Sequence, residues 1–391
     1  MPDAPADVVI AGASARALAE SAALAGYSVV ALDGYADLDL GMRVRAMSLP
    51  RDLGIPYSAT RAAAAAAGLS TPTAAYTSGF ENHPAAIATL ARGRTLWGNP
   101  PAVVRRVRHP TALRRALGGR GFALPDTRGE RAHREARASG QREWLLKPVR
   151  SGGGHGIRPW RPGIRLPGHA YLQERVHGDP GSIVFVADGR HAVPVGMSRQ
   201  LIGDGAFGAA GFRYAGSILC GASPLFAREA ELAAAAADLA AAVVEQFELV
   251  GLNGIDFIAR DGVPWPIEVN PRYTASMELI ERSRGISMFA LHVRACGGEL
   301  PPAELFRRRL RAVWGKAIVY AKGDVTMREI RRWWRDERVR DVPWPGERIR
   351  RGRPICTLLA RASDADACHR GLAAHAAEVY SAGTIAERSV A

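Results

Sequence analysis

The chain has 391 residues, of which 47% are hydrophobic and 23% are charged, a balance typical of a folded protein of two or three domains. It has no run of roughly 20 apolar residues that could span a membrane, and its first residues lack the basic head of a signal peptide, so we expect a cytoplasmic protein. The net charge of +14 would suit nucleic acid, but no zinc-finger or aromatic RNA-binding signature accompanies it, and a solvated surface or attraction for anionic substrates explains it better.

The first 100 residues alternate between short apolar runs and helix-forming segments. This pattern predicts strands at 7–10, 27–32 and 73–76 and helices at 15–25 and 61–68. Such alternation is typical of a doubly wound α/β sheet. The turn after the first strand is not Gly-x-Gly-x-x-Gly, so the fingerprint of a dinucleotide site is absent.

Ligands of a doubly wound sheet bind at the carboxyl ends of its strands. Gly12 and Ser14 follow the first predicted strand, and Glu81 lies in the loop after the third. We therefore predict that these three residues help to form a substrate pocket. Asp33 and Asp37 follow the second strand, where a ligand-binding acid could lie, but a solvated loop explains them at least as well.

The pattern changes after the two prolines at 100–101. A basic helix is expected around 102–117, and from residue 143 the sequence indicates strands and hairpins with a long alanine-rich helix. The expected strands are 143–149, 156–160, 169–177, 182–187, 191–197, 251–259, 264–270, 316–321 and 355–359. The expected helices are 228–247, 274–284 and 365–380.

Only three of the 52 basic side chains are lysines, and one of them, Lys147, stands just before a glycine-rich loop at 151–156. A lysine in a chain that otherwise uses arginine indicates a need for a compact ammonium on a flexible stem. Because the backbone N–H groups of such a loop can approach a polyanion closely, the natural ligand is a nucleotide phosphate. An ordinary glycine-rich turn after a strand is the alternative interpretation.

A second motif combines Asp256 with the segment 266–272, Pro-Ile-Glu-Val-Asn-Pro-Arg. Alternation along a strand puts Glu268 and Asn270 on one face, and Asp256 on the partner strand can bring a third oxygen ligand to the same place. Two carboxylates and a carboxamide suit Mg²⁺ held jointly by protein and phosphates. A solvated polar face on a hairpin is the alternative, but this combination of residues is highly specific.

Together the two motifs resemble those of the ATP-grasp superfamily, and the resemblance covers roughly residues 7–360. The segment 341–357 is similar to part of the small C-terminal domain of biotin-carboxylase-like members. Within the superfamily, the chain looks most like predicted ATP-dependent carboligases related to biotin carboxylase, which accompany tetrahydromethanopterin-dependent one-carbon metabolism. A role in that kind of cofactor biosynthesis is what this resemblance implies.

The resemblance implies an ATP-grasp architecture of three parts. These are a doubly wound pre-ATP-grasp domain at 1–100, a two-lobed ATP-grasp domain at 101–300 with a lid hairpin near 147–160, and a small C-terminal domain at 301–391. Members of the superfamily sandwich ATP between α+β lobes and activate a carboxylate as an acylphosphate, which an amine then attacks. We therefore expect an ADP-forming carboxylate–amine ligase that uses ATP with Mg²⁺ or Mn²⁺, acts on small molecules and forms a homodimer.

Alternative activities remain open for a chain with these motifs. An ATP-grasp kinase would leave the phosphate on a stable product, and a carboxylase would use bicarbonate. A non-catalytic nucleotide-binding or nucleic-acid-binding protein is an alternative from another class, although the presence of Glu268 and Asn270 argues against lost catalysis.

The resemblance also implies roles for individual residues. Lys147 is expected to reach the nucleotide, and Glu174 and Val176 are expected to bind the adenine at the hinge between the lobes. Arg272 and Arg199 are expected to neutralise the transferring phosphoryl group. The lid over the phosphates is expected to consist of Ser151, Gly152, Gly153, Gly154 and Gly156.

The lid is expected to be a hairpin, because the Arg-Pro-Trp-Arg-Pro sequence that follows it at 158–162 cannot readily begin a helix. A Walker-type loop would in addition need Gly-Lys-Ser or Gly-Lys-Thr. Many members of the superfamily have a second nucleotide-binding lysine before the lid. In this chain Arg105, Arg106 or Arg108 could replace that lysine, or the contact is lost.

Overall fold

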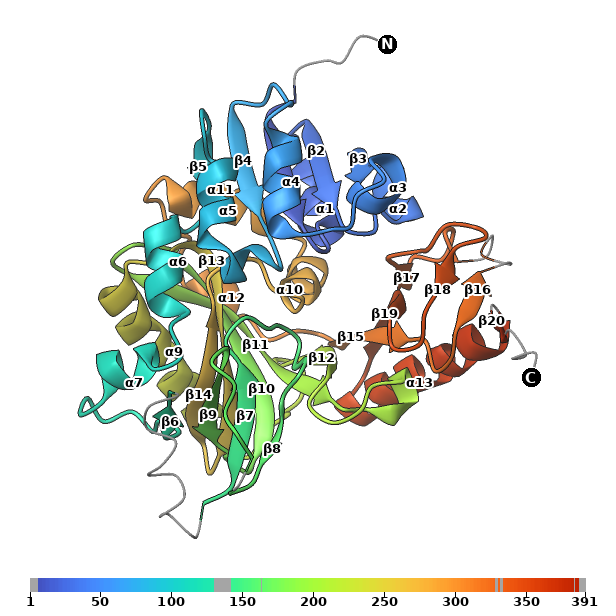
Figure 1. Cartoon of the computed structure of the whole chain (residues 1–391). Helices are drawn as coiled ribbons and strands as arrows, with labels where there is room; N and C mark the ends of the chain where they lie inside the picture. The colour runs from blue at the N-terminus through green and yellow to red at the C-terminus, as the bar shows by residue number, and fades with distance from the viewer. Residues whose placement is uncertain are drawn as a thin grey trace.

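The computed structural model describes residues 6–129, 142–162, 164–327, 330, 333–382 and 384–386. Four sheets organise this part of the chain, of five, eight, four and three strands. Figure 1 shows the N-terminal sheet at the top in blue and the C-terminal segment at the right in red. Within the described residues, no helix is long and apolar enough to cross a membrane.

The N-terminal sheet is parallel, with strand order β3-β2-β1-β4-β5. Alternate residues of β1 face opposite sides, since Val8 and Ile10 pack in a core with helix α1, while Val9 and Ala11 pack in a core with helix α4. The doubly wound α/β arrangement expected from the sequence is thus confirmed. Its strands are β1 (Val8–Gly12), β2 (Val29–Asp33), β3 (Arg45–Ser48), β4 (Thr73–Tyr76) and β5 (Thr95–Trp97). Its helices are α1 (Arg16–Leu24), α2 (Leu38–Gly41), α3 (Leu49–Asp52), α4 (Ala59–Ala66) and α5 (Pro84–Leu90).

The basic helix expected at 102–117 was a wrong prediction, because the structure has two short helices there, α6 (Pro101–Val107) and α7 (Ala112–Leu117). Pro110 explains the interruption, since proline lacks a backbone N–H and disfavours a helical conformation of the residue before it. The break is relevant to the site because it places Arg108 at the end of α6.

A small antiparallel sheet follows, with strand order β6-β9-β7-β8. Strands β7 and β8 pair directly, so the glycine-rich segment between them is the loop of a hairpin, as the sequence predicted. Trp144, Trp160 and Leu172 belong to the separate hydrophobic core of this sheet. Its strands are β6 (Thr127–Arg128), β7 (Trp144–Pro148), β8 (Arg158–Trp160) and β9 (Ala170–Glu174).

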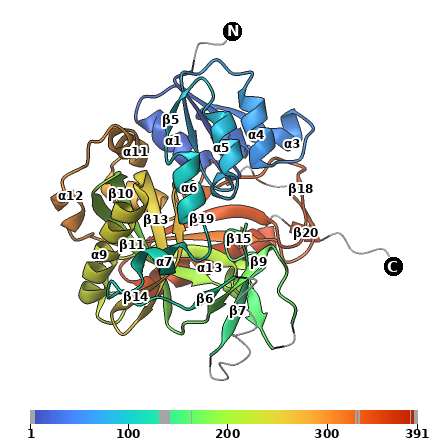
Figure 2. The same cartoon turned by 60° about the vertical axis from the view of Figure 1, so that its left-hand side comes forward.

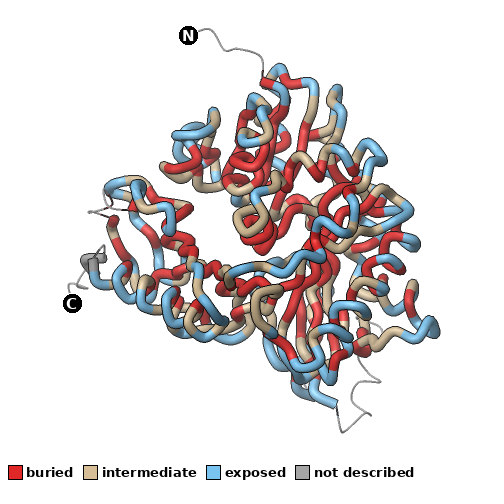
Figure 3. The backbone as a smooth tube through the Cα atoms, turned by 180° about the vertical axis from the view of Figure 1, so that it is seen from behind, coloured by how far each residue is buried: buried red, intermediate tan, exposed pale blue. Residues whose placement is uncertain are grey.

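The largest sheet is antiparallel, with strand order β14-β13-β10-β11-β12-β15-β19-β17. Ile183 and Phe185 of β10 share a core with helix α9 (Glu229–Phe247), and Val184 and Val186 share another with helices α10 (Met277–Arg284) and α11 (Met288–Cys296). Figure 2 shows the helices around these strands, and in Figure 3 the tube is coloured by the burial of each residue. The strands are β10 (Asp179–Asp188), β11 (Ala192–Ile202), β12 (Tyr214–Leu219), β13 (Val250–Arg260), β14 (Val263–Asn270), β15 (Val313–Tyr320), β17 (Val339–Arg340) and β19 (Pro354–Ala362).

Strands from the C-terminal segment continue this large sheet, since β15 pairs with β12 and β19 pairs with β15. Helix α13 (Ala365–Ala382) packs on β19 and β15. A three-stranded sheet of order β18-β16-β20 completes the segment, with β16 (Val325–Met327), β18 (Arg348–Ile349) and β20 (Thr384–Ala386). The domain limits at residues 100 and 300 stay a prediction.

A buried network of charges joins the N-terminal sheet to the remainder of the molecule. The guanidinium of Arg16, on α1, donates to both oxygens of Glu278 at 3.0 Å and to Asp341 Oδ1 at 2.6 Å. Lys316 Nζ lies 2.6 Å from the same Glu278 carboxylate. Burial alone would raise the pKa of Glu278, but the charges of Arg16 and Lys316 hold it well below its usual value. The network therefore fixes α1, α10, β15 and the residue after β17 relative to one another.

Candidate active site

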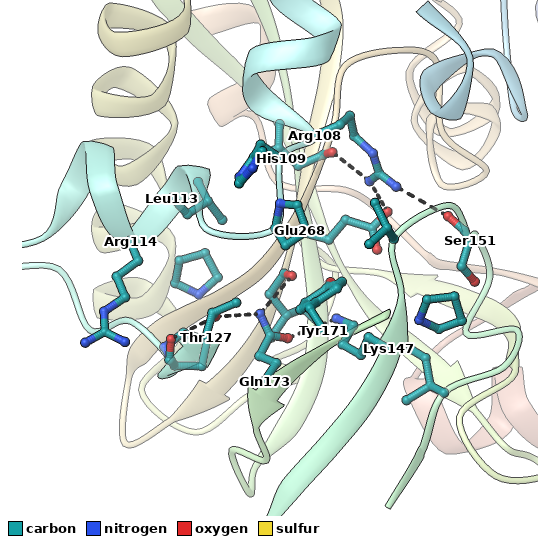
Figure 4. A pocket seen from close by; sticks show the side chains of 18 of the residues that line it. Arg108, His109, Leu113, Arg114, Thr127, Lys147, Ser151, Tyr171, Gln173 and Glu268 are labelled. Atoms are coloured by element: carbon teal, nitrogen blue, oxygen red, sulfur yellow. Dashed lines mark hydrogen bonds and ion pairs between the residues drawn. The ribbon is translucent and has the colours of Figure 1, made fainter. Parts of the chain in front are cut away.

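The two motifs of the sequence, far apart in the chain, line one cavity (Figure 4). Lys147 comes from β7 of the four-stranded sheet, and Glu268 comes from β14 of the large sheet. Figure 4 shows Arg108 and Glu268 above the cavity and Tyr171, Gln173 and Lys147 below it. The cavity therefore lies between the two sheets.

Lys147 is held inside this cavity and is 5% exposed. Its Nζ donates to Gln173 Oε1 at 2.9 Å and lies 5.9 Å from the centre of the Tyr171 ring. Both partners come from β9, the strand that pairs with β7. With one hydrogen bond in place, the ammonium has further donor capacity for a ligand in the cavity.

The glycine-rich loop bends over the side of the cavity on which Ser151, Gly152 and Gly154 lie. Gly154 has a φ of +75°, and a Cβ there would lie 1.7 Å from the carbonyl oxygen of Phe212. The neighbouring Gly153 accepts a hydrogen bond from Tyr214 N at 3.0 Å, which ties the loop to the start of β12. Glycine at position 154 is therefore required for this close approach to the β11–β12 connection.

Arg108 links four segments around the cavity. Its guanidinium forms an ion pair with Glu268 and donates to Val269 O at 3.2 Å, to Asn82 Oδ1 at 3.1 Å and to Ser151 O at 3.3 Å. Among the three arginines that the sequence offered in place of a second lysine, Arg108 lines the cavity. Its charge can therefore face both the glycine-rich loop and the acidic hairpin, which is the pair of strands β13 and β14 that carries Asp256 and Glu268.

Arg272 follows β14 and connects the hairpin to the N-terminal sheet. Its Nη2 donates to Glu81 Oε1 at 2.6 Å and lies 3.4 Å from Asn270 Oδ1. Glu81, in the loop after β4, is only 2% exposed. Glu81 Oε2 and Arg272 Nε are buried without a partner among the described atoms, although buried polar groups normally have one. Among the described atoms, Glu81 thus has an acceptor and Arg272 a donor without a hydrogen-bond partner beside the acidic hairpin.

Comparison with known proteins agrees with this geometry. The model of the ATP-grasp domain family matches residues 111–276, the segment that contributes the lid and the acidic hairpin. An ATP-grasp domain is thus present in this part of the chain. A 121-residue stretch is 31% identical to an uncharacterized protein of Methanocaldococcus jannaschii, and it covers 30% of this chain and 28% of that relative.

Solved structures share the ATP-grasp architecture over almost the whole chain. The biotin carboxylase domain of 2-oxoglutarate carboxylase from Hydrogenobacter thermophilus, solved with MgADP and bicarbonate, has a TM-score of 0.70 at 14% identity, with 92% of this chain and 87% of that one covered. N5-carboxyaminoimidazole ribonucleotide synthetase from Thermus thermophilus has a TM-score of 0.67 at 18% identity, covering 98% and 99%. L-amino acid ligase from Bacillus licheniformis has a TM-score of 0.68 at 15% identity, covering 99% and 100%. At these identities the likeness shows the fold.

Asp256 and Glu268 fit a divalent cation at this place. The two residues are direct neighbours on β13 and β14. Burial and the charge of Glu268 raise the pKa of Asp256 to about 6. Burial alone would also raise the pKa of Glu268, but the charges of Arg108 and Lys147 outweigh it and lower that pKa. A cation between the two carboxylates would relieve the repulsion that the raised pKa reports.

Two side-chain amide groups also contact Asp256. Gln200 Nε2 donates to its Oδ1, and Asn270 Nδ2 donates to its Oδ2, each at 3.0 Å. For Asn270 to contact a metal beside Asp256, its Oδ1 would have to take the place of Nδ2, which now donates to Asp256. No group of three or more His, Cys, Asp or Glu side chains that could hold a metal occurs among the described residues. A pair of carboxylates is nevertheless enough for Mg²⁺ that is shared with phosphates.

Several predicted site residues lie outside the cavity lining. Glu174 ends β9, where its Oε2 accepts from Asp126 N at 3.0 Å, and Val176 follows it. Gly12 and Ser14 lie at the carboxyl end of β1, where a Cβ on Gly12 would meet Thr77 Oγ1 and the carbonyl of Ser14 accepts from the same hydroxyl. The predicted adenine and substrate roles of these four residues stay predictions.

Arg199 is also not brought to the acidic hairpin. It lies on β11 next to Gln200, whose side chain reaches Asp256. Because successive side chains of a strand face opposite sides, Arg199 faces the other side of the sheet, toward α9. Its predicted catalytic role stays a prediction that the geometry does not favour, whereas Arg272 lies beside the hairpin.

Sequence reasoning missed the polar residues that support the site. Tyr171 and Gln173 are two residues apart on β9, so their side chains share the face of the strand that lies near Lys147. This spacing is the signal that could have found them. Gln200 lay beyond the strand expected at 191–197, and Asn82 lay in a loop, without a motif to distinguish either residue. Their partners come from distant parts of the chain, and such pairings depend on the tertiary fold.

Proposed function

We propose that this protein is an ATP- and Mg²⁺-dependent, ADP-forming ligase that joins a small-molecule carboxylate to an amine. Mn²⁺ is an alternative metal. The observation that carries the proposal is that Lys147, the glycine-rich hairpin loop and Glu268 line one cavity between two sheets. The family match and the three structural relatives, two of them named as a ligase and a synthetase, support this class of reaction.

In this proposal the cavity holds the nucleotide. Lys147 and Arg108 are the cations that would contact its phosphates, and the backbone of residues 151–156 would cover them. Asp256 and Glu268 would hold the metal ion together with phosphate oxygens. The metal ion supplies neutralisation of charge that develops on the transferring phosphoryl group. The protein contributes position and fixed charge, which is the main part of such catalysis.

The carboxylate and the amine would bind on the side of Arg272 and Glu81. The unpartnered Nε of Arg272 is a donor for an anionic oxygen, and the unpartnered Oε2 of Glu81 is an acceptor for an amine N–H. Balanced over the reaction, the carboxylate takes the γ-phosphoryl group of ATP, the amine nitrogen attacks the acyl carbon, and ADP, phosphate and one proton leave. A homodimer and a link to tetrahydromethanopterin-type metabolism remain parts of the proposal.

The test is a screen of candidate acids and amines for coupled ADP release. A ligase releases ADP and free phosphate only when both substrates are present. Release of ADP with one substrate, and with the phosphate retained on a stable product, would instead show a kinase. Bicarbonate as the required acid would show a carboxylase. The Glu268→Gln variant serves as the blank, because it lacks one of the two proposed metal ligands.

A further inference from the structure

A second cavity, of about 800 Å³, lies between the N-terminal sheet and the C-terminal segment. Loops that follow β1, β2 and β3 form one wall, and Arg350 and Arg353 from the turn between β18 and β19 form the other. The two walls are tied together, since Trp344 Nε1 donates to Ala36 O at 2.9 Å and Leu38 N donates to Val342 O at 2.8 Å. The size is that of a pocket for a small molecule.

The cavity lies at the carboxyl ends of parallel strands, the edge at which doubly wound sheets bind ligands. Strand order β3-β2-β1-β4-β5 reverses direction beside β1, and the cavity opens at the carboxyl ends of β1 and β2. The Asp33 carboxylate fixes these loops, because it accepts from Tyr35 N at 2.6 Å, Ala36 N at 2.9 Å and Ala15 N at 2.5 Å. Asp33 therefore shapes the wall, and its oxygens are used by the backbone.

The lining is basic and carries aromatic hydroxyl groups. Arg350 and Arg353 line the cavity, and the described lining contains no carboxylate. Arg353 Nη2 donates to Tyr35 Oη at 3.3 Å. On the opposite side, Tyr57 Oη is buried without a hydrogen-bond partner among the described atoms. Two guanidinium groups and an unpartnered hydroxyl in one cavity make a site for an anion.

Tyr57 also connects this cavity to the proposed reaction centre. A Cβ built on Gly79 would lie 3.8 Å from Tyr57 Oη, so the hydroxyl packs against the loop that carries Glu81. Glu81 in turn pairs with Arg272. A molecule in the second cavity would thus extend, past Tyr57, toward the open donor and acceptor of Arg272 and Glu81.

We propose that the second cavity binds the anionic end of the substrate, a phosphate monoester or a carboxylate, through Arg350 and Arg353. The inference rests on the proposed ligase function, whose substrate class it names. Tyr35 and Tyr57 offer ring faces for a flat part of the same molecule, and Tyr57 Oη adds a hydrogen bond.

The test measures binding of two aromatic anions, phenyl phosphate and benzoate, with benzyl alcohol as the neutral control, in the presence of saturating Mg²⁺ and ADP. We expect saturable binding of at least one anion and none of the alcohol. The double variant Arg350→Ala/Arg353→Ala should weaken that binding at least ten-fold, because it removes both guanidinium groups that line the cavity. Tyr57→Phe should weaken it several-fold without loss of stability.

Arg351→Ala is the matched control, since Arg351 lies in the same turn and is exposed like Arg350 and Arg353, but does not line the cavity. It should bind the anions like the wild type. If Arg351→Ala weakened anion binding equally, surface charge would explain the effect and the inference would be overturned. The inference would also be overturned if a protein that binds Mg²⁺–ADP showed no saturable binding of either anion. Conversely, a protein that binds the anion through Arg350 and Arg353 but binds no nucleotide would contradict the ligase function and leave the anion site standing.

Discussion

The carboxylates of Asp256 and Glu268 lie side by side on β13 and β14, where burial and the charge of Glu268 raise the pKa of Asp256. Arg108 and Lys147 keep Glu268 ionised, so the repulsion is carried by Asp256. Such a pair is destabilising in an empty site and favourable around a cation. The relationship therefore connects the pH dependence of stability to metal binding.

The contribution of Asp256 to the stability of the metal-free protein should fall as the pH rises through the interval from about 4 to 6. The folded-state pKa of Asp256, about 6, is above that of the unfolded chain, so the unfolded state binds fewer protons in this interval. Mg²⁺ should oppose this loss and raise the melting temperature more at pH 8 than at pH 5. Thermal unfolding with and without Mg²⁺ measures both effects.

The matched variants for that experiment are Glu268→Gln and Asp261→Asn. The first removes the charge that acts on Asp256 and should abolish the stabilisation by Mg²⁺. The second removes a carboxylate that is 86% exposed at the turn of the same hairpin, and it should behave like the wild type. A Mg²⁺ effect that survives Glu268→Gln would show that the metal binds elsewhere.

Gly154→Ala should impair the lid. The new methyl group would overlap the carbonyl of Phe212, and the residue would keep an unfavourable positive φ. We expect ADP affinity to fall at least ten-fold, measured by calorimetric titration. Gly153→Ala is the control, because Gly153 also has a positive φ but has no atom within 4 Å of a new Cβ. If both variants lost the same affinity, backbone strain rather than the contact with Phe212 would explain the effect.

Arg108→Ala should weaken binding of Mg²⁺–ADP by about ten-fold or more, and Arg105→Ala should not. Arg108 faces the cavity and contacts the lid and Glu268, whereas Arg105, on the same helix, is exposed and away from the cavity lining. Charged hydrogen bonds of this kind contribute about 1.5–3 kcal/mol. A titration in which the Arg105 variant is the weaker binder would contradict this assignment.

Arg16→Met should destabilise the fold by about 3–5 kcal/mol, because it leaves Glu278 and Asp341 buried without their shared cation. Lys316 and the partly exposed Arg282 still contact Glu278. Arg43→Met is the control: Arg43 contacts Glu20, as Arg16 does, but its side chain is 52% exposed. Such an exposed pair should contribute at most about 1 kcal/mol. Denaturant unfolding compares the two, and equal midpoints would show that the buried network does not stabilise the assembly of the sheets.

The sequence predicted the elements whose signal is local. The strands of the acidic hairpin were expected at 251–259 and 264–270, and Asp261 and Gly262 between them have the positive φ values of a tight turn. The alanine-rich helix expected at 228–247 is α9. Lys147 and Glu268 were placed around one site by their motifs, and both line one cavity in the structure.

What the sequence did not predict depends on contacts between distant segments. Pro110 divides a basic helix in two, and only the fold shows that Arg108 then reaches the acidic hairpin. The family resemblance implied a role for Arg199 near the phosphoryl group. Strand alternation instead turns its side chain away from the face on which Gln200 reaches Asp256. The cavity at Arg350 combines loops from both ends of the chain, which no local pattern could reveal.

Titration of Mg²⁺–ADP into the wild type and into Lys147→Ala tests most directly whether the two motifs form one nucleotide site. The account predicts one saturable site per chain, weakened at least ten-fold in Lys147→Ala, a loss of about 1.4 kcal/mol or more. The control is Lys322→Ala, which removes an exposed lysine that lies over the Tyr380 ring, and it should bind like the wild type. Unchanged affinity in Lys147→Ala would contradict the account.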